Sequence, residues 1–411
     1  MTTPSLNLDH RDLYRLPWSL SDNVISWLEP TKQCNIYCDG CYSSNANGSH
    51  KPLAQVAADL DVFEKYRKTD AVSVAGGDPL THPEVVEIVR MIARRGLKPV
   101  VNTNGFAMTP ALLRELEAAG LKGVTFHVDS LQRRPGWTGK SEVELNALRQ
   151  QFADMVAEVG GVSCSFNSTV YEKTLSAVPE IVDWARRNPS KVQVVVFIAF
   201  RTTLEGSYDY YVGAEKVSTR ELVYAGGRPE RVDISAREIA KVIHERFPGY
   251  QPAAYLNGTE QADAFKWLMT LVVNDGDEIV GSVGPRFVEL SQTANHLVKG
   301  NYLGYVGPEV MGRAKALLPL AALDGGLRAA ARRWLGAALR RPAKLLKPLY
   351  LQSIMVIQPV DVLADGRASM CDGCPDMTVH QGELVWSCRL EEQLRFGQWM
   401  RPVPRKANGA A

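Results

Sequence analysis

The feature that most constrains this sequence is a group of three cysteines, Cys34, Cys38 and Cys41, spaced C-x3-C-x2-C. They follow directly after a strand-like apolar run, residues 24–28. Cysteine thiolates are the protein ligands of iron–sulfur clusters, and three of them on one short loop can bind three irons of a four-iron cluster. The fourth iron then stays open to a small molecule. A zinc ion is the alternative, but no fourth ligand stands nearby at the spacing of a zinc finger.

A second cysteine group stands late in the sequence, at Cys371, Cys374 and Cys388. A C-x2-C pair followed by a third cysteine across a predicted hairpin is a metal-binding pattern. It favours a second iron–sulfur cluster, whose fourth ligand stays open between His380, an Asp and substrate. Zinc with His380 as the fourth ligand is the alternative. Cys164 lies alone in a strand-like run and is predicted to be a buried apolar residue. An odd number of cysteines in tight groups favours metal in a reducing cytosol over disulfides.

Composition argues against several classes of protein. The chain has 411 residues, 45% of them apolar, which is enough for two or three domains with a sizeable core. Its net charge of +2 gives no general case for binding nucleic acid. The first residues lack the basic and apolar regions of a secretory signal, and no run of 18 apolar residues is present to span a membrane. The expected location is therefore the cytoplasm.

Short apolar runs alternate with amphipathic helical patterns between residues 23 and 200. Strands are predicted over residues 24–28, 71–74, 98–102, 123–128, 162–170 and 192–200. Helices are predicted over residues 84–95, 109–119, 141–159 and 174–188, and further on over residues 235–247. Strands joined through helices of this length form parallel sheets with right-handed crossovers. An incomplete α/β barrel and a doubly wound open sheet are both compatible with the spacing.

Polar residues and glycines follow the ends of these strands. They are Gly76, Gly77, Asp78 and Pro79 after the second strand, Asn104 after the third, Asp129 after the fourth, and Asn167 within the fifth. Ligands bind at the carboxyl ends of parallel strands in such folds. We therefore expect these residues and the first cysteine group to converge on one mouth. Taken singly, each could also be only a plain turn or a polar residue at a strand end.

The cysteine loop, the Gly-Gly-Asp-Pro turn and the Thr-Asn-Gly turn together resemble the radical S-adenosylmethionine (radical SAM) superfamily. The resemblance covers residues 23–200. It implies a partial (β/α)6 barrel and a [4Fe-4S] cluster on Cys34, Cys38 and Cys41, whose fourth iron is chelated by the amino and carboxylate groups of SAM. It also implies reductive cleavage of SAM to a 5′-deoxyadenosyl radical that abstracts a substrate hydrogen. A donor such as flavodoxin or ferredoxin would supply the electron.

The same resemblance implies roles for residues around SAM. Backbone carbonyls at Gly76 and Gly77 would approach the methionine ammonium, since glycine has no side chain to block them. Asp78 would add negative charge and acceptors there, although many members of the family carry Glu at this position. Asn167 would lie near the ribose or the methionine carboxylate. Pro79, Asn104 and Asp129 are expected at the same site.

One position departs from the family pattern. The residue before the third cysteine is usually aromatic and packs beside adenine, but here it is Gly40. Tyr37 or Tyr42 is expected to supply that surface, or the backbone alone does so. The cysteine loop therefore resembles the family in its ligand spacing more closely than in its adenine contact.

A basic segment distinguishes residues 307–347, where nine Lys and Arg residues stand against two acidic ones. Its apolar residues form a stripe at helical spacing, namely Leu327, Ala331, Trp334, Leu335, Ala338 and Leu339. A basic amphipathic helix of this kind can lie on an anionic membrane surface. It can equally cover a core, with its arginines simply solvated.

These observations predict an α/β fold: a partial (β/α)6 radical SAM barrel, then a mostly helical insert and a small cysteine-rich extension. We expect an N-terminal extension over residues 1–22, the barrel over residues 23–235 and the insert over residues 236–350. An auxiliary-cluster domain that resembles the SPASM/twitch type would follow over residues 351–400, and a disordered tail over residues 401–411.

The predicted activity is hydrogen abstraction from an organic substrate that is not identified by the sequence. The basic segment favours a lipid-like or membrane-linked substrate and peripheral membrane contact. Maturation of a peptide and dehydrogenation of a sugar or aminocyclitol stay open. The non-enzyme alternative is an iron–sulfur electron-transfer protein, against which the glycine turn argues, since an electron carrier needs no SAM pocket. No nucleic-acid partner is expected.

Overall fold

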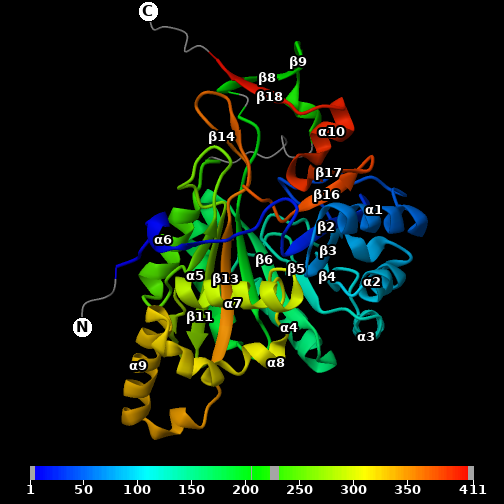
Figure 1. Cartoon of the computed structure of the whole chain (residues 1–411). Coiled ribbons are helices and arrows are strands. Elements are labelled where there is room, and N and C mark those ends of the chain that lie inside the picture. The colour runs from blue at the N-terminus through cyan, green and yellow to red at the C-terminus, as the bar shows by residue number, and fades with distance from the viewer. Residues whose placement is uncertain (1–4, 205, 223–230, 406–411) are drawn as a thin grey trace, which may run out of the picture.

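The computed structural model describes residues 5–204, 206–222 and 231–405, and a large mixed sheet lies at its centre (Figure 1). Six parallel strands form one side of this sheet in chain order. They are β2 (Ile25–Thr31), β3 (Ala71–Gly76), β4 (Lys98–Thr103), β5 (Gly123–His127), β6 (Ser163–Val170) and β7 (Val194–Ala199). All six lie where the sequence predicts strands, so the α/β fold class is confirmed.

Helices join successive strands and flank the sheet (Figure 1). They are α1 (Leu53–Tyr66), α2 (Val85–Arg94), α3 (Pro110–Ala118), α4 (Asn146–Val159) and α5 (Val178–Arg187). The last four match predicted helices, whereas α1 was not predicted. Its buried Val56, Leu60 and Phe63 nevertheless stand at helical spacing. Each buried side chain of this size contributes about 1.5–3 kcal/mol of transfer free energy, so packing on the sheet holds α1 in place.

The sheet continues beyond the six parallel strands. β13 (Tyr350–Ile357) pairs in parallel with β7, and β11 (Trp267–Asn274) pairs with β13 in antiparallel orientation. The edge is completed by β10 (Ala254–Leu256), β1 (Tyr14–Arg15) and β12 (Ile279–Ser282). The predicted mostly helical insert therefore also supplies three strands to the main sheet. The expected start of the last domain, at residue 351, falls inside one of the sheet's strands.

The helices of the insert are α6 (Ala236–Arg246), α7 (Pro285–Lys299), α8 (Pro308–Met311) and α9 (Gly325–Arg340). Short 3-10 helices are His10–Asp12, Pro79–Thr81, Glu172–Ala177, Thr219–Glu221, Ala314–Ala322, Pro342–Leu345 and Ser387–Arg389. Among the described helices, none combines the length and apolar character needed to cross a bilayer.

Helix α9 packs against β12 through Leu327, Ala330, Trp334 and Ala338. The predicted apolar stripe is correct for three of these residues and wrong for Leu335 and Leu339, which are 50% and 85% exposed. Ala330 fits because Gly281 of β12 has no side chain, and a Cβ there would lie 2.7 Å from the Ala330 methyl. The helix therefore covers a core with one face and presents leucines and arginines on the other.

The C-terminal part lies above the sheet in Figure 1. It contains β14 (Asp361–Val362), β15 (Ala368–Ser369), β16 (Met377–His380), β17 (Glu383–Trp386), α10 (Leu390–Phe396) and β18 (Arg401–Pro404). β18 pairs with β8 (Tyr208–Val212), which also pairs with β9 (Glu215–Val217). The expectation of a disordered tail from residue 401 is thus wrong for Arg401–Pro404. Residues 406–411 lie outside the described residues.

Candidate functional site

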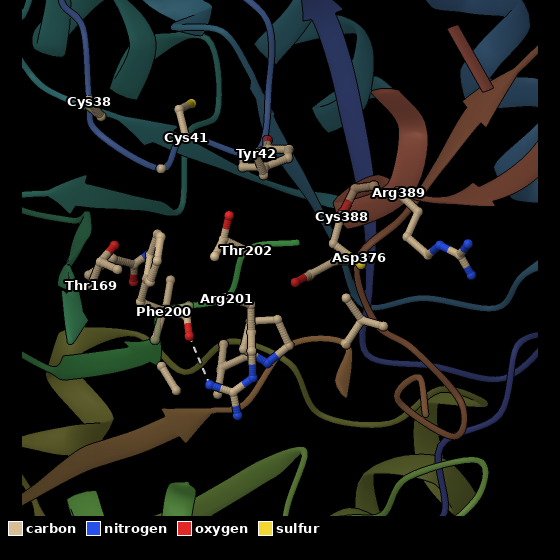
Figure 2. A pocket seen from close by; sticks show the side chains of 18 of the residues that line it. Cys38, Cys41, Tyr42, Thr169, Phe200, Arg201, Thr202, Asp376, Cys388 and Arg389 are labelled. Atoms are coloured by element: carbon tan, nitrogen blue, oxygen red, sulfur yellow. Dashed lines mark hydrogen bonds between the residues drawn. The ribbon is translucent and has the colours of Figure 1, made fainter. Parts of the chain in front are cut away.

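A cavity of about 410 Å³ opens at the carboxyl ends of the parallel strands. The loops after β2, β3, β4, β5, β6, β7 and β13 form its floor and walls, and the C-terminal part closes the opposite side. Both cysteine groups line it: Cys34, Cys38 and Cys41 from the first, and Cys371, Cys374 and Cys388 from the second. Figure 2 shows Cys38 and Cys41 on one wall and Cys388 on the other. Two groups more than 300 residues apart in sequence therefore face one space.

Backbone and side-chain hydrogen bonds fix the loop that carries the first cysteine group. The side chain of Asn45 accepts from the Cys34 amide at 2.9 Å and donates to the Cys34 carbonyl at 3.0 Å. The Asp39 amide donates to Leu131 O at 3.1 Å, which ties the loop to the turn after β5. Burial raises the pKa of the Cys41 thiol to about 11. A bound metal would supply the positive charge that stabilises such thiolates.

The glycine turn after β3 packs directly against the start of the cysteine loop. A Cβ on Gly77 would overlap the carbonyl oxygen of Gln33 and lie 2.5 Å from that of Lys32. Gly76 has a φ of +106°, and a Cβ there would overlap Thr31 O. Both glycines line the cavity. The close approach of two backbone segments therefore requires these glycines, and it leaves the turn's backbone facing the cavity.

Replacing Gly77 by alanine is expected to lower the free energy of unfolding by about 3 kcal/mol, because rigid backbone atoms occupy the space of the new methyl. Denaturant titration of both proteins measures this. Gly336→Ala is the matched control, since that glycine lies inside α9 with open space around it, and alanine there should add about 1 kcal/mol. Equal stability of Gly77→Ala and the unchanged protein would show that the turn has room to move.

Asp78 and Pro79 follow these glycines but are not among the residues that line the cavity. The Asp78 carboxylate is buried and accepts from Thr103 Oγ1 at 2.8 Å and from the Asn104 amide at 2.8 Å. It also accepts from the Leu80 amide at 2.9 Å. Burial raises the pKa of Asp78, although these hydrogen bonds oppose the rise. In the structure, Asp78 joins the turn after β3 to the turn after β4.

Phe200 occupies the space that a side chain at position 40 would need. Gly40 has a φ of +74°, and a Cβ there would overlap the Phe200 ring. The ring packs on Tyr171 with centroids 4.8 Å apart, and the Tyr171 hydroxyl donates to Asp39 O at 2.9 Å. Tyr37, by contrast, is 66% exposed and does not line the cavity. An aromatic surface is therefore present beside the loop, but it comes from the end of β7.

Tyr42, the other tyrosine considered for that surface, does line the cavity. Its hydroxyl donates to Gly76 O at 3.4 Å, and burial raises its pKa well above the usual range. Tyr42 thus connects the cysteine loop to the glycine turn.

Asn102 and Asn104 at the end of β4, and Asn167 in β6, bring amide groups into the cavity. Asn104 Nδ2 donates to Asn35 Oδ1 at 2.8 Å and lies 3.6 Å from Cys34 Sγ. Among the described residues, Asn167 Oδ1 and Asn102 Nδ2 are buried without a hydrogen-bond partner. An unsatisfied buried polar atom costs about 1–3 kcal/mol. A bound molecule with its own hydroxyl, amino and carboxylate groups would satisfy both.

Asp129 lies buried at the end of β5 and lines the cavity. Its Oδ2 is 2.8 Å from His127 Nε2, and its Oδ1 accepts from the Leu131 amide at 3.0 Å. Burial alone would raise the pKa of Asp129, but His127 and the Leu131 amide together lower it. His127 also lines the cavity. It is the last residue of β5, so the expectation that ligands bind at the carboxyl ends of strands applies to it as well.

The second cysteine group is held by residues far away in the sequence. Arg67 Nη2 donates to Cys374 O at 3.1 Å, and Asn23 Nδ2 donates to Gly373 O at 3.0 Å. Burial raises the pKa of Cys388 to about 12. The pKa of Cys374 is also raised, mainly by its hydrogen bond to Cys371 and in addition by burial. His380, the expected fourth ligand of a zinc site, is not among the residues that line the cavity.

A buried ion pair connects the two halves of the site. Lys32 Nζ, just before the first cysteine, lies 2.8 Å from Glu29 Oε2 and 3.3 Å from Glu391 Oε1 of α10. Glu391 also accepts from the Ser44 amide at 3.0 Å. Burial alone would lower the pKa of Lys32, but the two carboxylates raise it. These contacts connect the cysteine loop to α10 of the C-terminal part.

A charged group that the sequence did not reveal completes the wall after β7. Arg201 Nε is 2.7 Å from Asp361 Oδ1, and the fully buried Lys266 Nζ is 2.6 Å from Asp361 Oδ2. Arg201 and Asp361 line the cavity, and Figure 2 shows Arg201 on the wall below Phe200. Burial alone would raise the pKa of Asp361, but the two cations lower it. The pair comes from segments 160 residues apart, so no local pattern could have signalled it.

The donor set fits an iron–sulfur cluster. Within the described part of the chain, no three His, Cys, Asp or Glu side chains come close enough together to hold a single metal ion. A four-iron cluster makes a different demand, since each thiolate binds a separate iron. Three thiols on a pinned loop, the glycine turn and the two unsatisfied amides all face the same space.

Comparison with known proteins finds a family and several relatives that resemble part of this chain. Residues 28–185 match the model of the radical SAM superfamily. The AdoMet-dependent heme synthase of Methanosarcina barkeri is 27% identical over 188 residues, which is 43% of this chain and 50% of that protein. The tungsten-containing aldehyde ferredoxin oxidoreductase cofactor-modifying protein of Pyrococcus furiosus is 29% identical over 113 residues, 26% of this chain and 30% of that protein.

Among solved structures, SuiB of Streptococcus suis aligns with a TM-score of 0.40 at 14% identity, over 55% of this chain and 46% of that one. The chain spans half or less of the length of the two curated relatives. The named enzymes among the relatives support an enzyme over the expected alternative of an electron carrier. Members of the matched family use a [4Fe-4S] cluster and SAM. Residues 28–185, which carry the first cysteine group, therefore match the radical SAM superfamily.

Proposed function

We propose that this chain is a radical SAM enzyme that abstracts hydrogen from an organic substrate bound between two iron–sulfur clusters. The observation that carries this proposal is that both cysteine groups line one cavity of about 410 Å³. A substrate in that space would lie beside the first group, where radical chemistry starts, and within reach of the second, where an electron can be delivered or taken up. A reductant such as flavodoxin or ferredoxin would supply the first electron.

Residues around the first group would hold the cofactors. Cys34, Cys38 and Cys41 would bind three irons of the cluster. The cluster and SAM, when bound, would supply a 5′-deoxyadenosyl radical for abstraction of a substrate hydrogen atom. Gly76 and Gly77 would present backbone acceptors to the SAM ammonium, which their packing against the cysteine loop leaves facing the cavity.

The remaining expected SAM residues act in two ways. Asn167, with its unsatisfied Oδ1, and Asn104 would bind polar groups of SAM directly, and Asp129 would do so with His127 beside it. Asp78 would act as a positioning residue, because its carboxylate holds the Asn104 turn. Phe200 would take the place beside adenine that the sequence had suggested for Tyr37 or Tyr42.

The second cysteine group would bind an auxiliary iron–sulfur cluster. Its three thiols line the same cavity as the first group, and electron transfer to or from a substrate radical needs such proximity. Zinc is the alternative at this site. Metal analysis of protein lacking the first group separates the two, since iron with sulfide supports the proposal and zinc alone refutes it.

The cavity walls favour a substrate with a sizeable apolar part. Apolar side chains that line it are Trp27, Ile198, Leu204, Trp267, Ile357, Val360, Met370 and Met400. The ion pair between Arg201 and Asp361 provides a polar anchor on one wall. This combination suits a lipid-like molecule with one polar end, and a peptide side chain is the second candidate. Hydroxyl groups of a sugar or aminocyclitol would find no hydrogen-bond partner on these apolar side chains.

Hydrogen abstraction can be tested without knowing the substrate. Small molecules extracted from cells grown in deuterated medium are added to the reduced enzyme with SAM, and 5′-deoxyadenosine is examined by mass spectrometry. The proposal predicts deuterium in 5′-deoxyadenosine from at least one lipid-soluble fraction. Enzyme that cleaves SAM but acquires deuterium from no fraction would contradict hydrogen abstraction from a cellular substrate.

Peripheral membrane contact is supported by the outer face of α9 and the residues after it. Leu335, Leu339 and Leu346 are 50%, 85% and 88% exposed, and Arg332 and Arg340 are exposed on the same helix. An exposed set of leucines framed by arginines is suited to an anionic bilayer surface. Figure 1 places α9 at the end of the molecule opposite the C-terminal part that closes the cavity. The basic segment would therefore anchor the enzyme and would not itself capture substrate.

Changing Leu335, Leu339 and Leu346 to serine is expected to reduce binding to vesicles that contain anionic lipid by about tenfold or more, because three large apolar side chains no longer enter the bilayer. Vesicle sedimentation measures the bound fraction. Leu394→Ser on α10 is the control, since that residue is 48% exposed on the cavity side of the molecule. Equal binding of the triple variant and the control would reject membrane contact through this surface.

A further inference from the structure

Three cysteines supply only three of the four ligands that a [4Fe-4S] cluster takes from a protein when its irons are all occupied. Cys371, Cys374 and Cys388 therefore leave one iron of the proposed second cluster to another group. That group decides what the cluster can do. An open iron could bind substrate, whereas a fourth protein ligand would leave the cluster to transfer electrons.

Asp376 stands at the right place to be that ligand. It lies two residues after Cys374, just before β16, and it lines the cavity together with the three cysteines. The Ser387 amide donates to Asp376 O at 3.1 Å, so its backbone is fixed next to the residue that precedes Cys388. Figure 2 shows the side chains of Asp376 and Cys388 beside each other on the cavity wall.

The carboxylate of Asp376 has an unused acceptor. Its Oδ1 is buried and makes no hydrogen bond among the described residues. Burying a carboxylate oxygen without a hydrogen-bond partner costs free energy, and a bound cation or metal ion can offset that cost. An iron at this position would supply that partner.

Other side chains of the same region are already engaged. Asp372 is 46% exposed and pairs with Arg15 at 2.6 Å. Glu391 accepts from Ser44 and pairs with Lys32, and His380 does not line the cavity. Asp376 is therefore the best candidate that this region offers.

The surroundings of Arg67, beside the same cysteines, provide a second and independent observation. It is buried, and its Nη2 donates to Cys374 O at 3.1 Å. Its Nε and Nη1 are buried without a hydrogen-bond partner in the described part of the chain. A cluster with three thiolates and one carboxylate carries net negative charge and has sulfur acceptors. Such a cluster would balance this guanidinium and accept from its free N–H groups.

We propose that Asp376 is the fourth protein ligand of the second cluster, bound through Oδ1, and that Arg67 is the buried counter-charge of that cluster. This rests on the proposed second cluster. It implies that the cluster has no iron open to substrate and serves to transfer electrons. A carboxylate is a harder, weaker ligand for iron than a thiolate, so this corner of the cluster is its most labile one.

The test uses the full chain with Cys34, Cys38 and Cys41 changed to alanine, so that only the second site binds metal. Iron and sulfide content and EPR spectra are compared for this parent and for three derivatives, Asp376→Ala, Asp376→Cys and Asp372→Asn. We expect about four irons in the parent and in Asp376→Cys, and a shift to a three-iron cluster in Asp376→Ala, because the iron without a protein ligand is lost. Asp372→Asn should match the parent.

The outcomes separate the two proposals. A parent that binds no iron refutes the second cluster itself and the ligand with it. A parent with about four irons whose EPR spectrum and iron content are unchanged in both Asp376 variants refutes only the ligand assignment. An Asp376→Ala protein that loses all iron would be decided by Asp376→Cys, since recovery of the four-iron cluster supports a ligand and failure to recover it counts against one.

Arg67 is tested by the reduction potential of the same cluster. Arg67→Met is expected to shift the midpoint to more negative values, because the added electron is no longer stabilised by a buried cation. Arg67→Lys, which keeps the charge, should lie between the parent and Arg67→Met. Equal midpoints for the parent and Arg67→Met would show that the guanidinium does not face the cluster.

Discussion

Changing Cys34, Cys38 and Cys41 together to alanine is expected to abolish SAM cleavage and to leave about four irons in the protein, those of the second site. The three thiols line the cavity on one loop that hydrogen bonds hold in place. Iron and sulfide analysis, together with chromatography of 5′-deoxyadenosine after reduction, measures both parts of the expectation.

The control for that experiment is Cys164→Ala. Cys164 is buried in β6 and is not among the residues that line the cavity. Its replacement removes one sulfur from a core and should cost about 1 kcal/mol of stability without changing iron content or SAM cleavage. Formation of 5′-deoxyadenosine by the triple variant at the rate of the unchanged protein would contradict the assignment of the first cluster.

Changing Cys371, Cys374 and Cys388 to alanine is expected to have the opposite pattern. The variant should keep about four irons and still cleave SAM, while formation of substrate product falls below detection, because the proposed second cluster can no longer exchange an electron with the substrate radical. Measuring 5′-deoxyadenosine and product in the same sample shows whether the two have become uncoupled. The variants at the two sites are therefore complementary.

Two further results bear on that variant. Asp372→Asn is its control, because this residue lies between the cysteines but pairs with Arg15 on the surface. It should keep both activities. Normal product formation by the triple variant would mean that the second cysteine group is structural, and complete loss of SAM cleavage would mean that it is needed to assemble the first site.

The parallel sheet could be predicted because each of its strands carries a local signal. Buried strands between helices read as short apolar runs, and the rule that ligands gather at carboxyl ends placed the cysteine loop and the glycine turn correctly. The same rule applied to every strand end would also have found His127 and Phe200. Helix α1 was missed although Val56, Leu60 and Phe63 stand at helical spacing, since no side chain caps its start.

Other parts of the site depend on contacts that no local pattern contains. Gly40 looked like a missing aromatic, but the Phe200 ring that fills its place lies 160 residues further along the chain. Arg67 and Cys374 meet across 307 residues. The predicted last domain starts at residue 351, yet this residue lies in β13, which pairs in parallel with β7 of the main sheet. Sequence spacing fixes none of these pairings.

The basic segment shows how an amphipathic pattern can be placed on the wrong face. Leu335 and Leu339 fit a stripe with Leu327 and Trp334, but the buried face of α9 is rotated to include Ala330. A small residue there lets the helix approach Gly281 closely, which a larger side chain would prevent. The close packing of Ala330 on Gly281 sets the orientation of α9 on the sheet, and Leu335 and Leu339 are exposed to solvent.

The most direct test of the central claim is SAM cleavage by the isolated protein. Protein reconstituted anaerobically with iron and sulfide, reduced with dithionite and mixed with SAM should yield 5′-deoxyadenosine and methionine in equal amounts. This activity should follow the iron bound by Cys34, Cys38 and Cys41. If the EPR spectrum shows that cluster intact and the protein forms no 5′-deoxyadenosine, the chain is not a radical SAM enzyme.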